Sequence, residues 1–370
     1  MARLEDVCEV LDSLRVPITA SERVAGPYPY YGANGIQDHV ADYIFDDELV
    51  LIAEDGGNFG SKDRPIAYRI SGKCWVNNHA HVLKPKACID VDYLCYSLMF
   101  YDVSGLVNGA TRQKLTQADM RKMEVPLRTM EEQRKIIAIL NTVFDLISLR
   151  KQQLSKLDEL VKARFVEMFG SYPANEKGWE IGTIRDLVSE VRYGSSRKAS
   201  DGESGQYPYL RMNNITYSGE LDLTDIKTID VPENELPKCT VRKGDVLFNR
   251  TNSKELVGKT CVYNRDEMMV LAGFVVRIRV NKRILPEVLS CFLNTDFSKQ
   301  MLLGMCKTAI GQANINAQEL QDIGIYIPPI ERQNEFVDFK DHIDKSKLEI
   351  QKSLEKLEAL KKALMQKYFG

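Results

Sequence analysis

The chain contains one segment twice, and this repeat restricts the possible folds more than any other feature of the sequence. The first copy covers residues 125–170 and the second covers residues 327–370, and both end in Phe-Gly. Gln133 and Gln333 are 200 residues apart, as are the two final glycines. A period of this length predicts a duplicated pair of domains, because solenoid repeats are several times shorter.

Each copy has the hydrophobic pattern of one long coiled-coil helix. Apolar side chains recur at alternating intervals of four and three residues, interrupted in the first copy by Arg150, and the flanking positions are polar. Proline lies at the start of each copy, before the helix, and glycine ends it, which are helix start and stop signals. About 38 residues at about 1.5 Å per residue give a rod of about 55 Å, the length of one to two turns of duplex DNA. The predicted seam positions are Ile136, Leu140, Val143, Ile147, Leu154, Leu157 and Val161 in the first copy, and Phe336, Ile343, Ile350, Leu354, Leu357 and Leu364 in the second.

Two helices of matched length and sequence are natural partners for each other. The alternative is a pair of amphipathic helices packed separately into an ordinary core, which the duplication disfavours. The sequence divides accordingly into two globular regions, each followed by a helix. We predict a first globular domain over residues 1–128, a helix over 129–170, a second globular domain over 171–329 and a second helix over 330–370.

The globular regions have the pattern of strands joined by loops. Short apolar runs such as residues 48–53 and 80–83 alternate with Gly- and Asn-rich stretches, while residues 93–100 are helix-like. The predicted class is therefore α+β, with two mixed, β-rich globular domains and two long helices. The two domains are distant copies: residues 28–36 align with 207–215, 48–52 with 244–248, and 110–115 with 309–315 if one insertion is allowed.

Composition limits the classes of protein that this chain can be. With 44% hydrophobic and 28% charged residues, the chain is globular, and 370 residues predict two or three domains. Fifty basic and 52 acidic residues give a net charge of −2, so a DNA-binding face must come from the distribution of charge. Eight scattered cysteines without a Cys-x-x-Cys motif, no apolar run near the start and no membrane span predict a cytoplasmic protein.

Framework residues match between the two domains, while the loops between them differ. Different loops on one scaffold, held at the ends of a rigid spacer, are typical of a protein that reads two different short patterns a fixed distance apart. In the major groove, Arg and Lys bind guanine, Asn and Gln bind adenine, and Thr or aromatic groups contact the thymine methyl group. Loop residues of these types predict DNA contacts in the first domain at Tyr30, Tyr31, Asn34, Asn58, Lys62, Asn77, Asn78, His79, Arg112, Gln113 and Lys114. In the second domain they are Arg211, Asn213, Asn214, Asn249, Arg250, Asn252, Lys254, Lys259, Gln312 and Asn314.

Some of these positions have a second interpretation. Turn chemistry alone accounts for any single polar loop residue. Arg112-Gln113-Lys114 and Gln312-Ala313-Asn314 occur at matching places in the two domains, so we expect Gln113 and Gln312 to bind phosphate or brace the loop rather than read different bases. Gly258-Lys259-Thr260 resembles the end of a P-loop, but Ser253 stands where the required glycine would be. His79 and His81 have no nearby carboxylate or cysteine in sequence, which favours hydrogen bonding or DNA contact over a metal site.

The ordered set of motifs resembles the specificity subunit of type I restriction-modification systems over the whole chain. The resemblance rests on Gly311-Gln312-x-x-Ile315, on Leu320-x-x-Ile323, and on the run Ile327-Pro328-Pro329-Ile330-Glu331-x-Gln333 that enters a long helix. The first half carries looser versions in residues 112–115 and 125–127, without the double proline and with two extra residues before Glu132-Gln133.

The resemblance implies a specific organisation and function. The helices pack as an antiparallel coiled coil with a pseudo-two-fold repeat, and each target-recognition domain binds one half of a bipartite, asymmetric site in double-stranded DNA. The subunit is not an enzyme and binds no cofactor or metal itself. Two adenine methyltransferase subunits that use S-adenosylmethionine dock on it, and two restriction subunits that use ATP and magnesium can join.

Two other functional classes compete with this one. A fused methyltransferase-nuclease would need a cofactor loop and an Asn- or Asp-Pro-Pro-aromatic motif for a flipped adenine. The sequence has no Gly-x-Gly, and its one Pro-Pro pair, Pro328-Pro329, lies between isoleucines. A coiled-coil adaptor without DNA reading would not need two different sets of loops. A gel-shift assay with random duplexes and a methyltransferase subunit would discriminate a DNA reader from an adaptor, because an adaptor should give no sequence-dependent retention.

Overall fold

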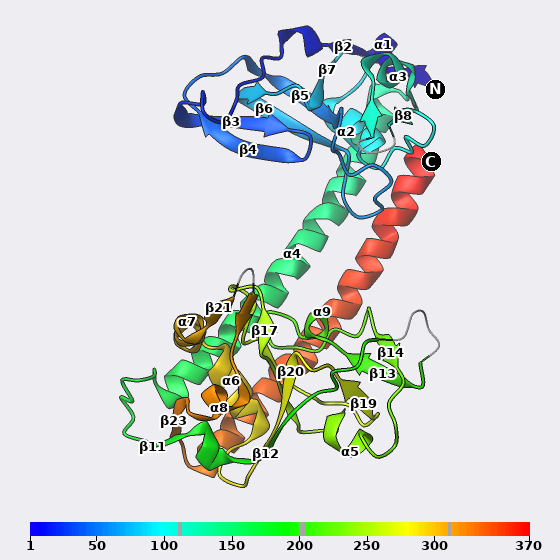
Figure 1. Ribbon diagram of the computed structural model, residues 1–370. Coiled ribbons are helices and arrows are strands. Elements are labelled where there is room, and N and C mark those ends of the chain that lie inside the picture. The colour runs from blue at the N-terminus through cyan, green and yellow to red at the C-terminus, as the bar shows by residue number, and fades with distance from the viewer. Residues whose placement is uncertain (110–112, 200–204, 310–311) are drawn as a thin grey trace. The chain divides into compact units, whose positions relative to one another are not determined.

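The computed structural model describes residues 1–109, 113–199, 205–309 and 312–370 (Figure 1). These residues form two compact units. Unit 1 consists of Met1–Lys151 and Lys352–Gly370, and unit 2 consists of Gln152–Gln351. Each unit therefore contains one globular region together with parts of both long helices.

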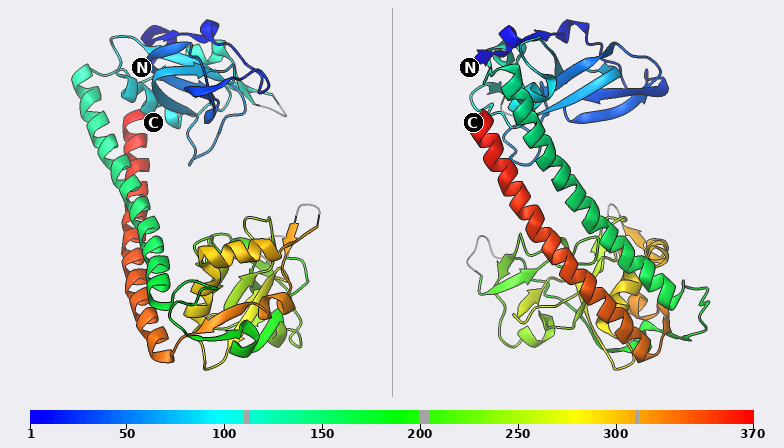
Figure 2. Two further views of the ribbon diagram at one scale, coloured as in Figure 1. Left: turned by 90° about the vertical axis from the view of Figure 1, so that its left-hand side faces the viewer. Right: turned by 180° about the vertical axis from the view of Figure 1, so that it is seen from behind.

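The two long helices have equal length and run through both units. α4 (Met130–Phe169) and α9 (Ile330–Phe369) contain 40 residues each. In unit 1 the start of α4 packs against the end of α9, and in unit 2 the end of α4 packs against the start of α9, so the helices are antiparallel in each unit (Figure 2). Thr129 and Glu132 begin α4 with a reciprocal capping box. The predicted α+β class with an antiparallel helix pair is confirmed.

Unit 1 is built on a six-stranded sheet in the order β2-β7-β5-β6-β3-β4. Its central strand β5 alternates its side chains between two cores. Val50 and Ile52 pack with α2 and α4, while Leu49 and Leu51 pack with β6. The strands are β2 (Cys8–Val10), β3 (Ala25–Gly32), β4 (Gly35–Val40), β5 (Phe45–Ala53), β6 (Ala67–Val76) and β7 (Ala80–Pro85). Around them lie β1 (Ala2–Arg3), α1 (Leu4–Val7), a 3-10 turn (Asp12–Leu14), α2 (Val91–Met99), β8 (Val107–Asn108), β9 (Lys114–Leu115), α3 (Gln117–Lys122) and β10 (Glu124–Val125).

Unit 2 has the same framework, but its sheet is divided into two. One four-stranded sheet has the order β12-β20-β16-β18 and the other has the order β14-β13-β19-β15. The strands are β11 (Glu180–Thr183), β12 (Val188–Tyr193), β13 (Tyr207–Leu210), β14 (Lys227–Ile229), β15 (Thr240–Val241), β16 (Val246–Asn249), β17 (Thr251–Asn252), β18 (Thr260–Val262), β19 (Met269–Leu271), β20 (Val275–Val280), β21 (Lys307–Ala309), β22 (Gln312–Asn314) and β23 (Gly324–Ile327). The helical segments are two 3-10 turns (Ile184–Leu187 and Met212–Asn214), α5 (Leu236–Cys239), α6 (Pro286–Asn294), α7 (Asp296–Met305) and α8 (Ala317–Gln321).

One interrupted strand explains why the second sheet is divided. In unit 1 the long strand β6 pairs with β5 and then, in parallel, with β3. In unit 2 the same two roles belong to separate strands: β18 pairs with β16, and β19 pairs in parallel with β13. The polar run Asn264-Arg265-Asp266-Glu267 is exposed between them, because charged side chains favour solvent over a central strand.

The same glutamine attaches each long helix to its globular region. Gln133 accepts from the Asp90 backbone N–H at 2.8 Å and donates to the carbonyl oxygens of Cys88 and Arg128 at 3.0 and 2.8 Å. Gln333 likewise accepts from the backbone of Leu285 at 2.8 Å and donates to the carbonyl oxygens of Arg283 and Pro328 at 2.9 and 2.8 Å. Asp90 and Leu285 precede the first turns of α2 and α6, so each glutamine links two helix starts.

None of the helices in the described parts of the chain has an apolar stretch long enough to cross a membrane.

Candidate nucleic-acid interface

In unit 1, hydrogen bonds bring together the three loops that carry predicted DNA contacts. Asn34 donates from Nδ2 to the Gly56 carbonyl oxygen at 3.0 Å, which joins the β3–β4 turn to the loop after β5. The Nδ1 atom of His79 lies 2.7 Å from a carboxylate oxygen of Asp55, which joins the same loop to the β6–β7 turn. Exposed or half-exposed side chains of this cluster are Tyr31, Asn34, Asn58, Lys62, Asn78 and His79.

Two residues predicted to contact DNA in unit 1 are buried. Tyr30 is 1% exposed, and its hydroxyl donates to the Ile18 carbonyl oxygen at 3.3 Å. Asn77 is 2% exposed; its Nδ2 donates to Gln37 at 3.0 Å, and its Oδ1 accepts from the His79 backbone at 2.8 Å. In this structure the two side chains brace the loops from inside the domain and do not lie on the surface.

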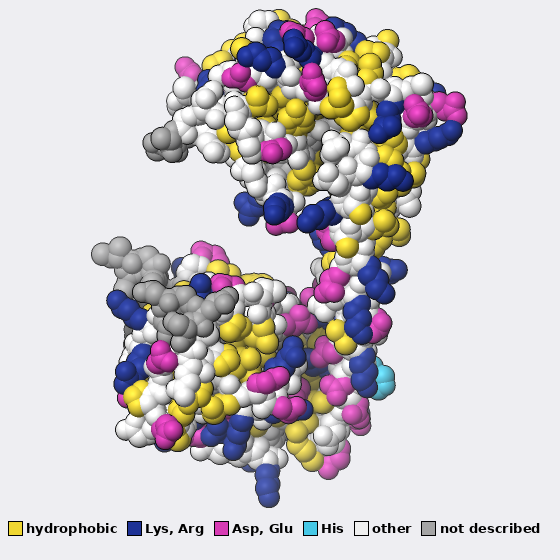
Figure 3. Space-filling view, turned by 90° about the vertical axis from the view of Figure 1, so that its right-hand side faces the viewer, with side chains coloured by type: hydrophobic (Ala, Val, Ile, Leu, Met, Phe, Trp, Pro, Cys, Tyr) yellow, Lys and Arg dark blue, Asp and Glu magenta, His cyan; other side chains and the backbone are white. Residues whose placement is uncertain are grey.

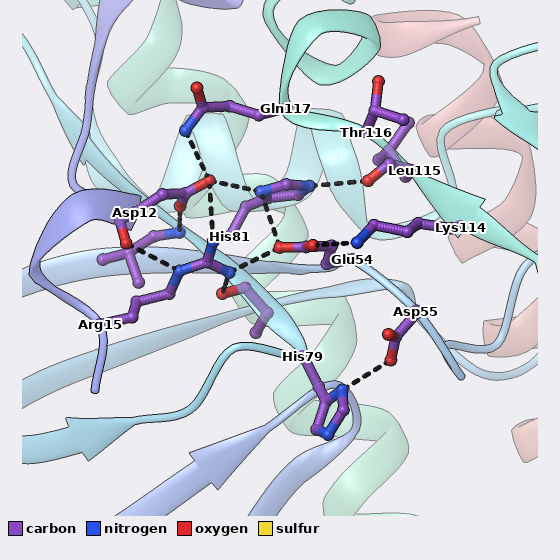
Figure 4. A network of polar contacts seen from close by, with 12 residues as sticks. Asp12, Arg15, Glu54, Asp55, His79, His81, Lys114, Leu115, Thr116 and Gln117 are labelled. Atoms are coloured by element: carbon purple, nitrogen blue, oxygen red, sulfur yellow. Dashed lines mark hydrogen bonds and ion pairs between the residues drawn. The ribbon is translucent and has the colours of Figure 1, made fainter. Parts of the chain in front are cut away.

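A buried polar network lies beneath this loop cluster and connects it to β9 (Figure 4). The Asp12 carboxylate lies 2.6 Å from Nδ1 of His81, whose Nε2 is 2.9 Å from the Leu115 carbonyl oxygen. Glu54 accepts from Arg15 at 2.7 Å and pairs with Lys114 at 2.8 Å. The network thereby holds the segment that follows residues 110–112 against the end of β5.

Groups of the chain itself compensate the two carboxylates of this network. Ligand atoms of Asp12, Glu54 and His81 lie within 4.8 Å of one another, a spacing that could suit a metal. Both ring nitrogens of His81 already face acceptors, however, and Arg15 and Lys114 supply positive charge beside Glu54. Burial raises the pKa of Asp12 and of Glu54, but the hydrogen bonds from His81 and Lys114, among others, outweigh burial and hold both pKa values below their usual range. We therefore interpret the cluster as a structural ion-pair network.

The predicted loops of unit 2 are also joined to one another. Lys259 donates from Nζ to the Met212 carbonyl oxygen at 3.0 Å, which joins the loop between β17 and β18 to the 3-10 turn after β13. Thr251 donates to the side-chain oxygen of Asn314 at 3.0 Å, which adds β22 to the cluster. The Arg250 guanidinium lies 4.8 Å from the centre of the Tyr193 ring. Exposed or half-exposed predicted residues are Arg211, Asn213, Arg250, Asn252, Lys254 and Asn314.

Three residues predicted to contact DNA in unit 2 are buried. Asn214 is 2% exposed and donates to the carbonyl oxygens of Asp222 and Asp225 at 2.8 and 3.2 Å. Burial lowers the pKa of Lys259, which is 7% exposed. Asn249 is fully buried, and among the described residues neither end of its amide has a hydrogen-bond partner. Asn214 and Lys259 hold their loops in place through hydrogen bonds, and none of the three side chains forms the outer surface.

An equivalent backbone hydrogen bond occurs in both units. It joins β9 in unit 1, and the residue after β22 in unit 2, to the residue that follows the central strand. Leu115 donates to the Glu54 carbonyl oxygen at 2.7 Å, and Ile315 donates to the Arg250 carbonyl oxygen at 2.9 Å. Leu115 and Ile315 are therefore structural counterparts, and Gln113 corresponds to Ala313. The sequence alignment, with its one insertion, placed residues 112–115 opposite residues 312–315 in the same register. Gln113 and Lys114 are exposed; Arg112 and the side chain of Gln312 lie outside the described residues.

Along the helices, the predicted seam is most deeply buried in unit 1. There Ile136, Leu140, Val143 and Ile147 are at most 6% exposed. Phe336 is fully buried in unit 2, where its ring lies 5.3 Å from that of Phe165. The remaining predicted positions are half-buried, namely Leu154, Leu157, Val161, Ile343, Ile350, Leu354, Leu357 and Leu364.

Two lysines occupy seam positions that the sequence analysis did not identify. Lys340 and Lys347 correspond, 200 residues later, to Leu140 and Ile147 of the first copy. Lys347 is 6% exposed and is one of three buried residues of α9. A comparison of the two copies position by position would have revealed both lysines, because each replaces an apolar seam residue.

The surface charge is mixed, and several predicted cations already have acidic partners. In Figure 3, basic and acidic side chains are interspersed over the visible face. Arg211 pairs with Asp225 at 2.8 Å, and Lys114 pairs with Glu54 at 2.8 Å. Part of the positive charge of the loop clusters is therefore neutralised within the chain itself.

The chain matches one family model over most of its length. Residues 1–159 and 176–362 match the model described as the type I restriction modification DNA specificity domain. Two specificity subunits from other organisms are similar to this chain over most of its length. The type I restriction enzyme MjaVIII specificity subunit of Methanocaldococcus jannaschii is 24% identical over 99% of this chain and 90% of its own length. The EcoKI specificity subunit of Escherichia coli is 22% identical over 78% of this chain and 66% of its own length.

Solved structures have the same fold. The S subunit of a type I restriction-modification system from M. genitalium superposes with a TM-score of 0.56 at 14% identity, covering 100% of this chain and 95% of that one. A chain from a structural study of complex assembly in the type I system gives a TM-score of 0.53 at 16% identity, covering 100% of this chain and 96% of that one.

Proposed function

The chain belongs to the type I restriction-modification DNA specificity family, and on this basis we propose that it reads a bipartite, asymmetric site in double-stranded DNA. The domains proposed to bind the two half-sites are residues 1–128 and 171–329, and the helices within 129–170 and 330–370 set the gap between them. The observation that supports this proposal most directly is a repeated framework with different loops. Equivalent bonds dock Leu115 and Ile315, yet the residues beside them, Lys114 and Asn314, differ in chemistry.

The accessible side chains of the two clusters suit different bases. In the first domain Asn34, Asn58 and Asn78 offer amides, which pair with adenine in the major groove. In the second domain Arg211 and Arg250 offer guanidinium groups, which pair with guanine. Each such bidentate contact contributes about 1–3 kcal/mol of discrimination. Exposed lysines at the loop tips, Lys62 and Lys254, suit phosphate contacts that position the duplex.

The buried members of the predicted set act indirectly in this proposal. Asn77 and Asn214 hold the backbone of their loops through hydrogen bonds to neighbouring segments. Replacement of either would therefore disturb several base contacts at once, whereas replacement of an exposed member would affect one. The recognised half-site sequence is then set by few side chains on a braced loop.

We further propose that two methyltransferase subunits dock on the helices, and that two restriction subunits can join them. Leu160 and Leu360 are equivalent positions of the two copies, and both are 45% exposed. Ile139, Leu146 and Leu149 add exposed apolar surface to α4. Equivalent apolar positions on two antiparallel helices suit two copies of one partner. S-adenosylmethionine, ATP and magnesium belong to these partners in the proposal, and this chain supplies recognition alone.

Sequencing of adenine methylation in single DNA molecules tests the proposed function. Cells expressing this chain with the methyltransferase subunit encoded beside it are compared with cells expressing the methyltransferase alone. We expect a new motif that consists of two unlike half-sites separated by a fixed gap. Exchange of residues 171–329 for the corresponding domain of another specificity subunit is expected to change one half-site and leave the other intact.

The competing classes give different results in the same experiment. A coiled-coil adaptor would form a stable complex with the methyltransferase and add no new sequence motif. A motif with a single uninterrupted recognition sequence would contradict the assignment of one half-site to each domain.

A further inference from the structure

Lys347 lies where three segments of unit 2 meet. It belongs to α9, and its ammonium donates to the carboxylate of Asp158 on α4 at 2.5 Å. It also donates to the carboxylate of Glu220, which lies in the turn after the 3-10 helix Met212–Asn214. One buried cation therefore joins both long helices to a loop of the second globular domain.

The loop that Lys347 contacts is continuous with the candidate recognition loop. Asn214 donates to the Asp222 carbonyl oxygen at 2.8 Å, and Asp222 donates back from its backbone to Asn214 at 2.9 Å. Arg211 reaches across to Asp225 at 2.8 Å. Residues 211–225 are thus one hydrogen-bonded segment, with candidate base contacts near its start and the helix contact at Glu220.

The turn that carries Glu220 also fits tightly against the rest of the domain. Gly219 has φ +88°, and a Cβ there would lie 2.6 Å from Nδ2 of Asn294 and 2.9 Å from the Thr260 carbonyl oxygen. The Glu220 backbone donates to the hydroxyl of Thr216 at 2.9 Å. The turn is held against α6 and β18 on one side and against Lys347 on the other, so its position depends on α9.

The interaction is absent from the equivalent position of the first copy among the described residues. Ile147 stands 200 residues before Lys347 and is buried to the same degree, with each 6% exposed. An apolar residue therefore satisfies helix packing at this position. A buried lysine loses hydration, and replacing such ion pairs with apolar groups is often neutral or stabilising, so stability alone does not account for lysine here.

We propose that Lys347 is a positioning residue that fixes the orientation of the second recognition domain on the helices and thereby restricts the gap length that the protein accepts. This inference rests on the proposed function, in which two domains read half-sites across a gap. Loss of the contact with Glu220 would free residues 211–225 to shift against α9. The base contacts would survive, while the distance between the half-sites would be less strictly defined.

The test measures gap preference separately from half-site sequence. Lys347→Met removes the cation and keeps a long apolar side chain, Glu220→Gln removes the negative charge of one partner, and Lys347→Arg retains the positive charge. Lys345→Met is the matched control, because Lys345 is exposed on the same helix two residues away. Each variant is expressed with the methyltransferase subunit, and adenine methylation is sequenced together with the melting temperature of the purified chain.

We expect Lys347→Met and Glu220→Gln to methylate the same half-sites with a broadened gap. The preference for the wild-type gap over a gap one base pair longer or shorter should fall about tenfold. Lys347→Arg and Lys345→Met should keep the wild-type preference. Lys347→Met should melt below the wild type, because Asp158 and Glu220 lose their shared cation.

Either of two results would overturn the inference: a wild-type gap distribution for Lys347→Met, or an altered half-site sequence. If Lys347→Met does not fold, Glu220→Gln decides by the same criterion, since Glu220 is a partly exposed loop residue. Failure of the proposed function is distinguishable, because the wild-type chain would then produce no bipartite motif.

Discussion

At the scale of single residues, the two buried glutamines at the helix starts make equivalent contacts in the two halves of the molecule. Gln133 and Gln333 are both 0% exposed, and each makes one accepted and two donated hydrogen bonds to the backbone. A side chain that satisfies three buried backbone groups is difficult to replace, because each group left without a partner loses its solvation without compensation.

Replacement of Gln133 or Gln333 with leucine should therefore destabilise the protein despite similar side-chain volume. One N–H group and two carbonyl groups would lose their partners, so we expect a loss of about 1–3 kcal/mol in the free energy of unfolding. Urea unfolding followed by circular dichroism measures this loss. Gln152→Leu, at an exposed position of α4, is the control and should change stability by less than about 0.5 kcal/mol. Equal effects of the buried and exposed replacements would contradict the bracing role.

Because Asp12 and Glu54 are paired carboxylates, we expect acid to lower the free energy of unfolding of unit 1. Both carboxyl groups have a lowered pKa in the folded protein, so their contribution to stability is complete above the unfolded pKa of about 4 and is lost as the pH falls through the folded pKa. Glu54→Gln should lose about 2 kcal/mol at pH 7 and progressively less as the pH falls through the lowered pKa of Glu54 in the folded protein, because the native glutamate becomes protonated there. Denaturation at pH 7 and at a series of acid pH values checks this difference.

A matched carboxylate provides the control for this pH dependence. Asp46 is exposed on β5, and Asp46→Asn should leave the dependence of stability on pH close to that of the wild type. A wild-type pH profile for Glu54→Gln would show that the network does not govern acid sensitivity.

At the scale of secondary-structure elements, α4 and α9 are equal in length but differ in how they pack. The first turns of α4 bury Ile136, Leu140, Val143 and Ile147, whereas the equivalent turns of α9 place Lys340 and Lys347 in the seam. Lys340 pairs with Asp344 at 2.5 Å on its own helix, and Lys347 pairs across to Asp158. Polar seam residues specify register at some cost in stability, so the second half of the repeat is suited to precise alignment.

Removal of one heptad from each helix tests whether the helices determine the gap. Deleting residues 150–156 and 350–356 preserves the seven-residue period and shortens each helix by about 10.5 Å, or about three base pairs of DNA. We expect methylation at the wild-type gap to disappear, with a shorter gap accepted or specific methylation lost. Methylation sequencing and a melting curve report the result and the integrity of the fold.

The control for this deletion keeps the length of the helix. Replacing residues 150–156 by the sequence of residues 350–356 changes side chains without changing the rise, and the accepted gap should remain that of the wild type. An unchanged gap in the shortened protein, with the fold intact, would exclude the helices as the determinant of spacing.

At the scale of the whole molecule, charge limits how tightly the chain can bind DNA alone. The net charge is −2, and predicted cations such as Arg211 and Lys114 are paired with carboxylates. Affinity for duplex DNA rises with the number of phosphates that a protein neutralises and falls with salt. The isolated chain should therefore bind weakly until partner subunits add basic surface.

Fluorescence anisotropy with a labelled duplex measures this property. The isolated chain should bind with a dissociation constant of about 10⁻⁴–10⁻⁶ M at physiological salt, and the methyltransferase complex should bind more tightly and show a steeper salt dependence. A duplex with scrambled half-sites serves as the control. Tight, salt-resistant binding by the chain alone would contradict the requirement for partners.

The fold was predictable because its signals are local and repeated. The heptad spacing of the helices, the duplicated Gln-to-Gly segment and the alternation of apolar runs with loops are readable along the chain, and they led to the α+β class and the helix pair. The division of the second sheet was not predicted, because it depends on the interruption between β18 and β19 by a short polar run.

The composition of the candidate site was less predictable than the fold. Loop position and residue type identified the segments that hydrogen bonds bring together, but these signals did not separate exposed side chains from braces. Asn34 and Asn77 have the same chemistry in neighbouring loops, yet one is exposed and the other is 2% exposed.

By itself, the sequence determined the repeat, the class of fold and the family, because period and motif spacing are properties of the linear chain. Only the tertiary structure decided which polar residues face solvent and which hold the framework. Asn77 is buried because Gln37 satisfies its amide, and Lys347 is buried because Asp158 and Glu220 satisfy its charge. Burial of a polar group requires a partner, and these partners come from segments that only folding brings into contact.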